Sequence, residues 1–477
     1  MRDPAELARP AASPPAREGF WSNVREALRG SEQDYTRGSI GRAIFLLAIP
    51  MVLEMAMESI FAVTDVFFVG RLGPDAVATI GLTESMLTLV YALAIGLGIG
   101  TTAVVARRVG EKDRDGAAHA AVQATALGIA GAVLLGGLGV TFAPRLLALM
   151  GASPAVLQVG SGYTRVMLGG EATIVVLFVV NAVFRGAGDA AIAMRVLWLA
   201  NAINIVLGPC FIFGLGPFPE LGVTGAAVAT TIGRGTGALY AISRLLRPGS
   251  RIAVQQRHLR LDMPVMRTVA RLSGSGALQS IIGMASWIGL VRIVATFGSQ
   301  ALAGYTIGIR IVIFALLPSW GMSNAAATMV GQALGARDPD RAERAVWRAC
   351  LYNLVFLSAI GLAFVVFAAP IVSAFTSDPA VLRYGVECLR IIAAGFAFYA
   401  YGMVLSQSFN GAGDTFTPTM INLIVFWLWE IPLAWALAVV LGMGPRGAFV
   451  AVAVAFSTLA VAAGAIFRRG RWKRTAV

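Results

Sequence analysis

Apolar segments long enough to cross a membrane recur along the whole chain, and they constrain the fold more than any other feature. A helix of about 20 apolar residues spans a hydrocarbon layer of about 30 Å. Only 13% of the 477 residues are charged, about half the share usual in a soluble domain. The short alternating segments of an outer-membrane barrel do not occur. Twelve apolar segments therefore predict an all-α polytopic membrane protein with twelve transmembrane helices.

Basic residues are concentrated in three places. Seven arginines lie between Arg2 and Arg42, seven lie between Arg244 and Arg271, and five basic residues lie between Arg468 and Arg474. This positive-inside pattern predicts a bacterial inner-membrane protein with both termini and the central loop in the cytoplasm. The net charge of +13 thus orients the chain in the bilayer, and we expect no nucleic-acid partner.

The sequence also contains an internal repeat, in which the two halves match at one constant offset without a gap. The offset places Phe184-Arg-Gly-Ala-Gly-Asp189 on Phe409-Asn-Gly-Ala-Gly-Asp414, and Gly110 on Gly335. We expect two homologous lobes, 41–247 and 266–470, with a tail at 1–40, a basic linker at 248–265 and a second tail at 471–477.

Six segments in each lobe give the two lobes the same orientation in the membrane. Such parallel repeats are related by an axis along the membrane normal, and two six-helix bundles around a V-shaped cleft suit alternating access. We therefore expect a transporter of small molecules that is embedded in membrane lipid and is monomeric. No His/Asp/Glu constellation lies on facing segments, so we do not expect an enzyme.

Carboxylates within the membrane are the most informative side chains, because each costs about 2.5–3.5 kcal/mol on insertion scales. Glu54, Glu58 and Asp65 lie within roughly 40° of one another on a helix with about 100° per residue. A cluster that binds and releases H+ or Na+ is what an antiporter needs. The alternative is that these acids pack against Ser, Thr and Asn neighbours or lie near the interface.

The second lobe lacks this cluster, since Glu54 aligns with Gln279 and Glu58 with Gly283. We therefore expect ion coupling in the first lobe. Glu430 lies either in the cleft or at the interface. Candidates for lining the substrate cleft are Glu84, Glu171, Asn181, Glu430 and Tyr399.

The two Gly-Ala-Gly-Asp segments resemble phosphate-binding loops only superficially, because no strand precedes them and no Walker motif occurs. We expect tight helix–helix turns with glycine at positive φ instead. Cys210, Cys350 and Cys388 have no metal-like spacing, so we expect neither a metal nor a cofactor.

Several motifs together resemble the multidrug and toxic compound extrusion (MATE) family. They are Pro50, Val63-Thr-Asp-Val-Phe-Phe-Val-Gly-Arg-Leu-Gly73, the two Gly-Ala-Gly-Asp segments, Asn201-Ala-Ile-Asn-Ile-Val-Leu207 and Gly222-Val-Thr-Gly-Ala-Ala-Val-Ala-Thr230. The resemblance covers essentially the whole chain from about residue 36. It implies a two-lobed antiporter that exports cationic drugs and metabolites in exchange for H+ or Na+.

The resemblance also implies an ion site in the first lobe. Its parts are a first-span Asp (here Asp65), a fifth-span Asn (Asn204) with an Asp four residues later, and a sixth-span Thr (Thr230). Gly208 stands in the place of the second Asp. Glu54 and Glu58 supply the missing charge on this interpretation, which favours protons over sodium.

In other branches of the family the second lobe carries a Glu and an Asp, and these positions fall here on Gly283 and Tyr399. The nearest alternative function is a flippase for a lipid-linked precursor. That activity would require Arg or Lys inside the cleft to hold pyrophosphate, and Arg292 and Arg310 are the residues to examine.

Overall fold

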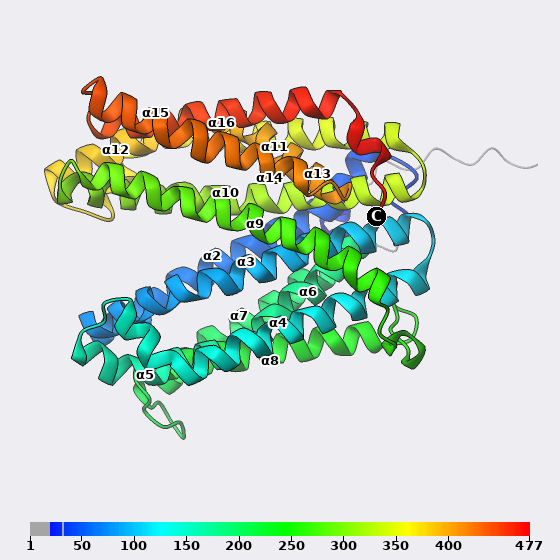
Figure 1. Ribbon diagram of the computed structural model, residues 1–477, viewed down its shortest axis with the longest axis horizontal. Helices are drawn as coiled ribbons and strands as arrows, with labels where there is room; N and C mark the ends of the chain where they lie inside the picture. Colours follow the sequence, from blue (N-terminus) through cyan, green and yellow to red (C-terminus); the bar gives the residue numbers. More distant parts are fainter. Residues whose placement is uncertain (1–19, 31–32) are drawn as a thin grey trace, which may run out of the picture.

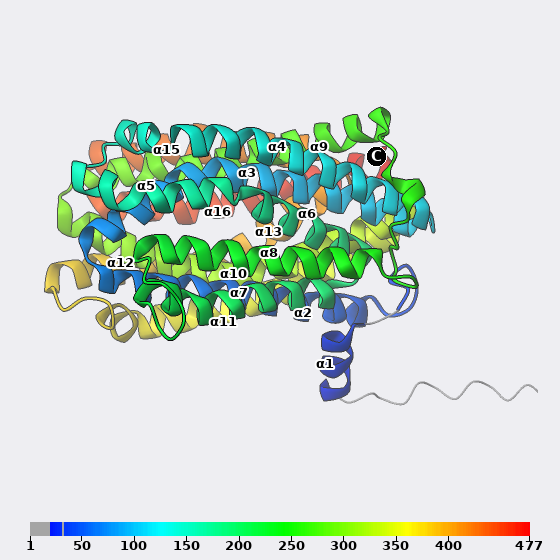
Figure 2. The same cartoon turned by 90° about the horizontal axis from the view of Figure 1, so that it is seen from below.

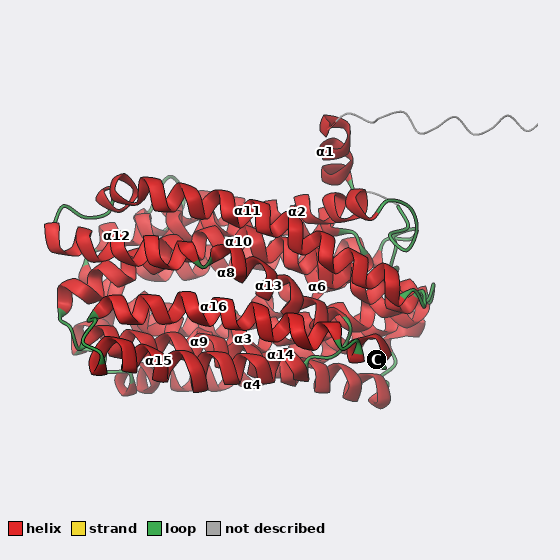
Figure 3. Cartoon of the chain, turned by 90° about the horizontal axis from the view of Figure 1, so that it is seen from above, coloured by secondary structure: helices red, strands yellow, loops and turns green. Residues whose placement is uncertain are grey.

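The computed structural model describes residues 20–30 and 33–477, and within them the chain is entirely helical apart from its connections (Figure 3). Positions 1–19 of the tail predicted at 1–40 lie outside the described part. Ten of the described helices are long and apolar enough to cross a membrane, or eleven if one bent pair counts as a single span. α8 (Val223–Leu246) is a further long helix outside that count, and it carries Arg234.

The helices form two bundles that lie side by side at one end of the molecule and diverge toward the other (Figure 1). The first comprises α2 (Ile40–Val69), α3 (Pro74–Gly110), α4 (Arg114–Leu149), α5 (Pro154–Gly169), α6 (Glu171–Ala187), α7 (Ala190–Phe213) and α8. The second comprises α9 (Met263–Ala295), α10 (Ser299–Gly335), α11 (Pro339–Ser373), α12 (Pro379–Ala394), α13 (Phe396–Gly411), α14 (Phe416–Asn422), the π-helical η4 (Leu423–Glu430), α15 (Ile431–Trp435), η5 (Ala436–Val440) and α16 (Pro445–Arg468). Both bundles are joined at the end where the described termini lie, which we call the termini end.

A glycine interrupts the helix in the fourth span of each lobe, although the first-lobe segment Pro154–Ala187 still counts as one span. Gly170 separates α5 from α6, and Gly395 separates α12 from α13 with a bend of 58°. These two glycines occupy equivalent positions in the internal repeat. Because glycine is a poor helix former, a break at this position is inexpensive in both repeats.

The repeat axis runs between α3 and α10 at the termini end. Gly335 of α10 lies against Gly110 of α3, so that a Cβ on Gly335 would be 2.9 Å from the Gly110 Cα. Gly186 packs against the carbonyl of Thr102, and Gly411 packs against that of Ala327, which is the equivalent contact. Contacts between equivalent residues occur only near a symmetry axis, so the repeat in sequence is also a repeat in space.

Packing at the termini end crosses between the halves of the sequence. Ile44, Leu47 and Met51 of α2 are buried in a core that they share with α10, α11, α13 and α16. Val269 and Leu272 of α9 belong to the core of the first bundle. Each lobe therefore receives one end of a helix from the other half, which ties the two bundles together at this end.

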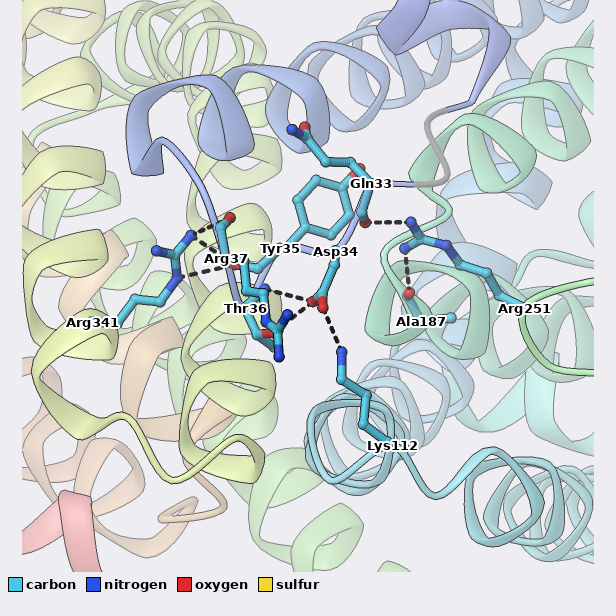
Figure 4. Close-up of polar contacts among 9 residues, drawn as sticks. All are labelled: Gln33, Asp34, Tyr35, Thr36, Arg37, Lys112, Ala187, Arg251 and Arg341. Carbon is cyan, nitrogen blue, oxygen red and sulfur yellow. Dashed lines mark hydrogen bonds and ion pairs between the residues drawn. The ribbon is translucent and has the colours of Figure 1, made fainter. Parts of the chain in front are cut away.

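An N-terminal strap, residues 33–38, lies across both bundles at this end (Figure 4). Arg341 of α11 donates hydrogen bonds to the carbonyls of Tyr35, Arg37 and Gly38 at 2.9–3.1 Å. On the other side, Lys112 Nζ lies 2.6 Å from Asp34 Oδ2. The strap thus links α11 of the second bundle to the α3–α4 turn of the first.

A C-terminal strap, residues 471–477, makes a second connection. Arg107 of α3 donates to the Thr475 carbonyl at 2.7 Å and to the Ala412 carbonyl at 3.3 Å. Lys473 forms an ion pair with Glu343 of α11 at 2.6 Å. Separation of the bundles at the termini end therefore requires both straps to be rearranged.

The predicted Gly-Ala-Gly-Asp turns are present at the termini end. Gly188 has φ 83° and Gly413 has φ 86°, which is the left-handed region that glycine tolerates best. The prediction of helix–helix turns with glycine at positive φ is confirmed.

Candidate functional site

Glu54, the most buried carboxylate of α2, is held in an ion pair. Glu54 is 2% exposed, and its Oε1 lies 2.7 Å from Nη1 of Arg185 on α6. Its Oε2 is buried without a hydrogen-bonding partner among the described residues. Asn181, also on α6, is buried close to the same carboxylate. The arginine supplies the countercharge that makes a carboxylate tolerable at this depth.

Glu58 belongs to a ring of polar contacts that links α2, α7 and α8. Its Oε2 accepts a hydrogen bond from Asn201 Nδ2 at 3.0 Å, and its Oε1 lies 4.0 Å from Arg234 Nη2. On the far side of the ring, Asn204 Nδ2 donates to Thr230 Oγ1 at 2.6 Å. Thr230 and Arg234 are one helical turn apart, so they share a face of α8.

Arg234 of α8 is the most buried arginine among the described residues of this lobe. It is 7% exposed, and its Nη2 donates to the Tyr91 hydroxyl of α3 at 3.1 Å. Its Nη1 is buried without a hydrogen-bonding partner in the described part of the chain. The arginine thereby connects α8 to both α2 and α3, and one of its donors remains available.

Asp65 differs from the other two acids of α2. It is partly exposed, and no hydrogen bond or ion pair to it occurs among the described residues, although Glu84 and Arg234 are its charged neighbours. Arg185 pairs with Glu54 and Arg234 lies within ion-pair distance of Glu58. Asp65 is the acid of α2 that has no ion pair among the described residues.

The three acids of α2 share a face but do not form one compact cluster. Eleven residues at a rise of about 1.5 Å put Glu54 and Asp65 roughly 16 Å apart along the helix. Glu54 pairs with α6, Glu58 contacts α7 and α8, and Asp65 lies toward Glu84 of α3. The angular argument from sequence predicted a shared direction and ignored this axial separation.

Two of the other candidates in the first lobe, Glu171 and Glu84, lie outside the charged network, by which we mean Glu54, Glu58, Asp65, Arg185 and Arg234. Glu171 is 1% exposed at the start of α6, where it lies close to Gly136 of α4, and one of its oxygens has no partner among the described residues. It is about 15 Å along α6 from Asn181. Glu84 is exposed, and its charged neighbours are Asp65 and Arg310 of the second bundle. Of the two, only Glu84 lies near the charged network.

Gly208 lies beside the Asn204–Thr230 contact. A Cβ built on Gly208 would meet only Asn204 Oδ1, at 3.9 Å. The position therefore has room for a side chain pointing toward the amide. The chain as it stands places no carboxylate there.

A cavity of about 590 Å³ lies mainly in the second bundle, between α9, α10, α13, α14, η4 and α16, and Ile95 and Ile99 of α3 also line it. Glu430 and Tyr399 both line it, and so does Gly283. Glu430 is 2% exposed and has no hydrogen-bonding or ion-pairing partner among the described residues. It ends a π-helical segment, a distortion that is frequent at functional sites.

Several other polar atoms around this cavity are unsatisfied. The Tyr305 hydroxyl, Gln279 Oε1 and Ser406 Oγ are buried without hydrogen-bonding partners in the described chain. Aromatic residues form much of the remaining wall: Trp287, Trp320, Tyr399, Phe426 and Phe456. Arg310 lies in the wall and has Glu84 of the first bundle as its acidic neighbour. Unsatisfied polar groups beside an apolar wall are the usual properties of a small-molecule site.

Sequence analysis missed the two arginines that lie against the acids of α2. Arg185 was considered only as part of a turn motif, and Arg234 was not considered at all. The available signal was an arginine inside a long apolar segment, which marks a functional candidate in its own right. Asn201 could have been found in the same way as Asn204, since it lies one turn earlier on the same helix.

Comparisons with known proteins agree with this architecture. The model of the MatE family matches residues 50–210 and 273–436, one match in each half. "Probable multidrug resistance protein NorM" of Thermotoga maritima is 26% identical over 448 residues, 92% of this chain and 94% of the relative. A protein of Shewanella oneidensis named "FAD transporter" is 28% identical, over 83% of this chain and 87% of its own.

Solved structures show the same arrangement of helices. The structure described as "Outward-facing conformation of a multidrug resistance MATE family transporter of the MOP superfamily" superimposes with a TM-score of 0.86 at 26% identity. The match covers 92% of this chain and 98% of that one. A structure of a MATE protein in complex with MaL6 gives a TM-score of 0.87. The expectation of an all-helical polytopic membrane protein built from two repeats is confirmed.

Proposed function

We propose that this chain works as a secondary antiporter. It belongs to the MATE family, and it is a multidrug efflux transporter rather than an enzyme. Small organic compounds, mostly cationic or amphipathic, leave the cell in exchange for H+ or Na+. The basic residues at the termini end support a cytoplasmic location for both termini and for the linker at 248–265. The protein then functions as a monomer in the bacterial inner membrane.

The observation that carries this proposal is the charge imbalance in the first lobe. Two buried arginines neutralise two of the three acids of α2, which leaves one negative charge at Asp65. Binding of one H+ or Na+ at Asp65 neutralises the network, and release restores the charge. Glu54 and Glu58 keep their arginine partners and do not bind the coupling ion. Asn204 and Thr230 complete the ring of polar contacts that connects α7 to α8.

Protons are favoured as the coupling ion. A sodium site needs several oxygen ligands around the ion, and the fifth-span position that would supply a second carboxylate is Gly208. The Asn204 amide already donates to Thr230, so that hydroxyl has a partner without an ion. A single carboxylate is sufficient for a proton.

Substrate binds in the cavity of the second bundle in this proposal. An organic cation with a flat apolar body gains cation–π contacts from the aromatic wall and an ion pair from Glu430. Tyr399 stacks on Phe456 with ring centroids 3.8 Å apart and forms one wall. Glu84 and Arg310 lie where the two bundles face each other. In this proposal Asn181 and Glu171 do not contact the substrate and contribute to packing inside the first lobe.

A flippase for a lipid-linked precursor is the alternative function. Its pyrophosphate would need arginines that are free to bind anions. Arg185 is in an ion pair with Glu54, and Arg234 has Glu58 and Tyr91 as partners. Of the two arginines singled out from the sequence, Arg292 is exposed and does not line the cavity, whereas Arg310 lines it. The acidic neighbour Glu84 weakens Arg310 as an anion site.

The test is efflux of ethidium from proteoliposomes with an imposed pH or sodium gradient. We expect native protein to respond to the pH gradient. Asp65→Asn should abolish gradient-driven efflux and leave ethidium binding within about twofold, because the charge imbalance is removed while the cavity is intact. Glu430→Gln should instead weaken ethidium binding.

Glu171→Gln is the matched control, since it removes a buried carboxylate that lies outside both sites. It should support normal efflux. Normal gradient-driven efflux in Asp65→Asn would show that coupling occurs elsewhere. The absence of any cation efflux from folded native protein would favour the flippase.

A further inference from the structure

The short helix α1 (Phe20–Arg29) projects sideways from the bundle, with its axis across the long axes of the spanning helices (Figure 2). Helices of 36 or 37 residues are about 55 Å long, whereas the hydrocarbon layer is about 30 Å thick. The bundle thus extends beyond the hydrocarbon at both ends. Because the spanning helices follow the membrane normal, the axis of α1 runs parallel to the membrane plane, set back from the tip of the termini end (Figure 2).

Contacts with α7 and α2 hold α1 in this orientation. Arg195 of α7 donates to the Leu28 carbonyl at 2.7 Å, which caps the last turn. Arg42 of α2 forms an ion pair of 2.6 Å with Glu26. Ala27 is 2% exposed and packs in the core that contains the first half of α2. The helix is therefore presented to its surroundings with a defined face, which lowers the entropic cost of binding.

The outward face of α1 combines an aromatic residue with positive charge. At about 100° per residue, Val24, Leu28 and Trp21 fall within an arc of about 60°, and Arg25 and Arg29 follow within about 80° of Trp21. The Trp21 side chain is 79% exposed, and both arginines are exposed. Glu26, the one acid in α1, lies on the other side and is engaged by Arg42.

This combination matches the chemistry of a membrane surface. Tryptophan is enriched at the boundary between headgroups and acyl chains, and basic residues beside an apolar stripe attract anionic lipids. We infer that α1 is a membrane-surface helix that binds anionic phospholipids of the leaflet at the termini end, with Trp21 inserted at the acyl boundary and Arg25 and Arg29 on the phosphates. The inference does not depend on the coupling ion or the substrate.

The experiment uses the full chain with Cys210, Cys350 and Cys388 replaced by Ala. A single NBD probe is placed at Trp21→Cys, and the protein is reconstituted in nanodiscs of phosphatidylcholine alone or of phosphatidylcholine mixed with phosphatidylglycerol. Quenching by lipids that carry a nitroxide in the headgroup or high on the acyl chain reports insertion. We expect strong quenching that is at least twofold greater with phosphatidylglycerol, and loss of that difference in Arg25→Gln/Arg29→Gln.

A probe at Glu111→Cys is the control, because Glu111 is exposed in the α3–α4 turn at the same end of the bundle. It should stay unquenched in both lipids. Equal quenching at positions 21 and 111 would overturn the inference, as would quenching at position 21 that ignores phosphatidylglycerol.

Tryptic cleavage of the native protein after Arg25 and Arg29 provides a second measurement that needs no cysteine replacement. Cleavage should slow at least fivefold in nanodiscs with phosphatidylglycerol. Equal cleavage rates in the two lipids would contradict binding of α1 to anionic headgroups.

Discussion

Gly110 and Gly335, which are equivalent in the two halves of the sequence, lie against each other where α3 crosses α10. A Cβ on Gly335 would be 2.9 Å from the Gly110 Cα and would also meet the Arg107 carbonyl. The neighbouring atoms belong to the backbone, so they cannot move aside as a side chain would. Close approach of the two bundles at the termini end therefore depends on the absence of side chains at this crossing.

Gly335→Ala should consequently force α3 and α10 apart. We expect a loss of about 1–3 kcal/mol in stability, as for other overpacked positions. Thermal unfolding in detergent measures it. Gly137→Ala on α4 is the control, because a Cβ there meets nothing within 4 Å. Equal melting temperatures for the two variants would contradict the close crossing.

The pair of Glu54 and Arg185 should be strongly coupled. Glu54→Gln leaves Arg185 charged and unpaired in a buried site, and we expect a loss of about 3–5 kcal/mol. Arg185→Gln should cost a similar amount for the same reason. The double variant should recover part of the loss, and a double-mutant cycle on the free energy of unfolding quantifies the coupling. Additive losses would show that the ion pair contributes nothing.

Gly208→Asp should introduce the carboxylate that the family resemblance leads one to expect beside Asn204. The position has room, since a Cβ there meets only Asn204 Oδ1 at 3.9 Å. An acid beside Asn204 should allow a sodium gradient to drive efflux that in the native protein depends on pH. Gly208→Asn is the neutral control. Sodium-independent efflux in Gly208→Asp would show that geometry at this position does not support an ion site.

Removal of the Arg341 side chain should release the N-terminal strap. Four hydrogen bonds to the carbonyls of Tyr35, Arg37 and Gly38 are lost in Arg341→Ala. Hydrogen exchange of the amides of residues 33–38 should accelerate at least tenfold. Arg344→Ala, an exposed position on the same helix, should leave exchange unchanged. Slow exchange in Arg341→Ala would mean that other contacts hold the strap.

The Asp34–Lys112 pair should set the pH below which the N-terminal strap loses this stabilisation, which we call its acid limit. Partial burial opposes ionisation of Asp34, but hydrogen bonds from Lys112 and Thr36 outweigh it and lower the pKa from 3.8 to about 2. Because the folded-state pKa is the lower one, the stabilisation is complete above about pH 4 and disappears as the pH falls toward 2. Exchange protection of the Thr36 amide, corrected for the intrinsic rate, should be flat from pH 8 to 4 and then fall.

Lys112→Met should shift that fall toward the ordinary pKa of an aspartate. An unchanged profile in Lys112→Met would show that the lysine does not set the acid limit. A loss of protection near neutral pH in the native protein would show that another group controls the strap.

Much of the candidate site followed from residue type and position along the chain. Glu54, Glu58 and Asp65 were identifiable because a carboxylate in an apolar segment is costly and needs a reason. Asn204 and Thr230 came from the family resemblance, and their contact at 2.6 Å is a structural result. Arg234 was missed because attention to acids did not extend to the cations that must neutralise them.

The sequence by itself determined the membrane class, the duplication and the parallel orientation of the halves, because hydrophobic segment length and repeat offset are properties of the chain alone. Tertiary structure decided which charges meet. Residues as distant in sequence as Glu54 and Arg185, or Asp34 and Lys112, are brought together only when helices pack, since their partners come from other helices and turns. It also decided that Glu430 faces a cavity rather than lipid, because a helix face has no environment until its neighbours cover it.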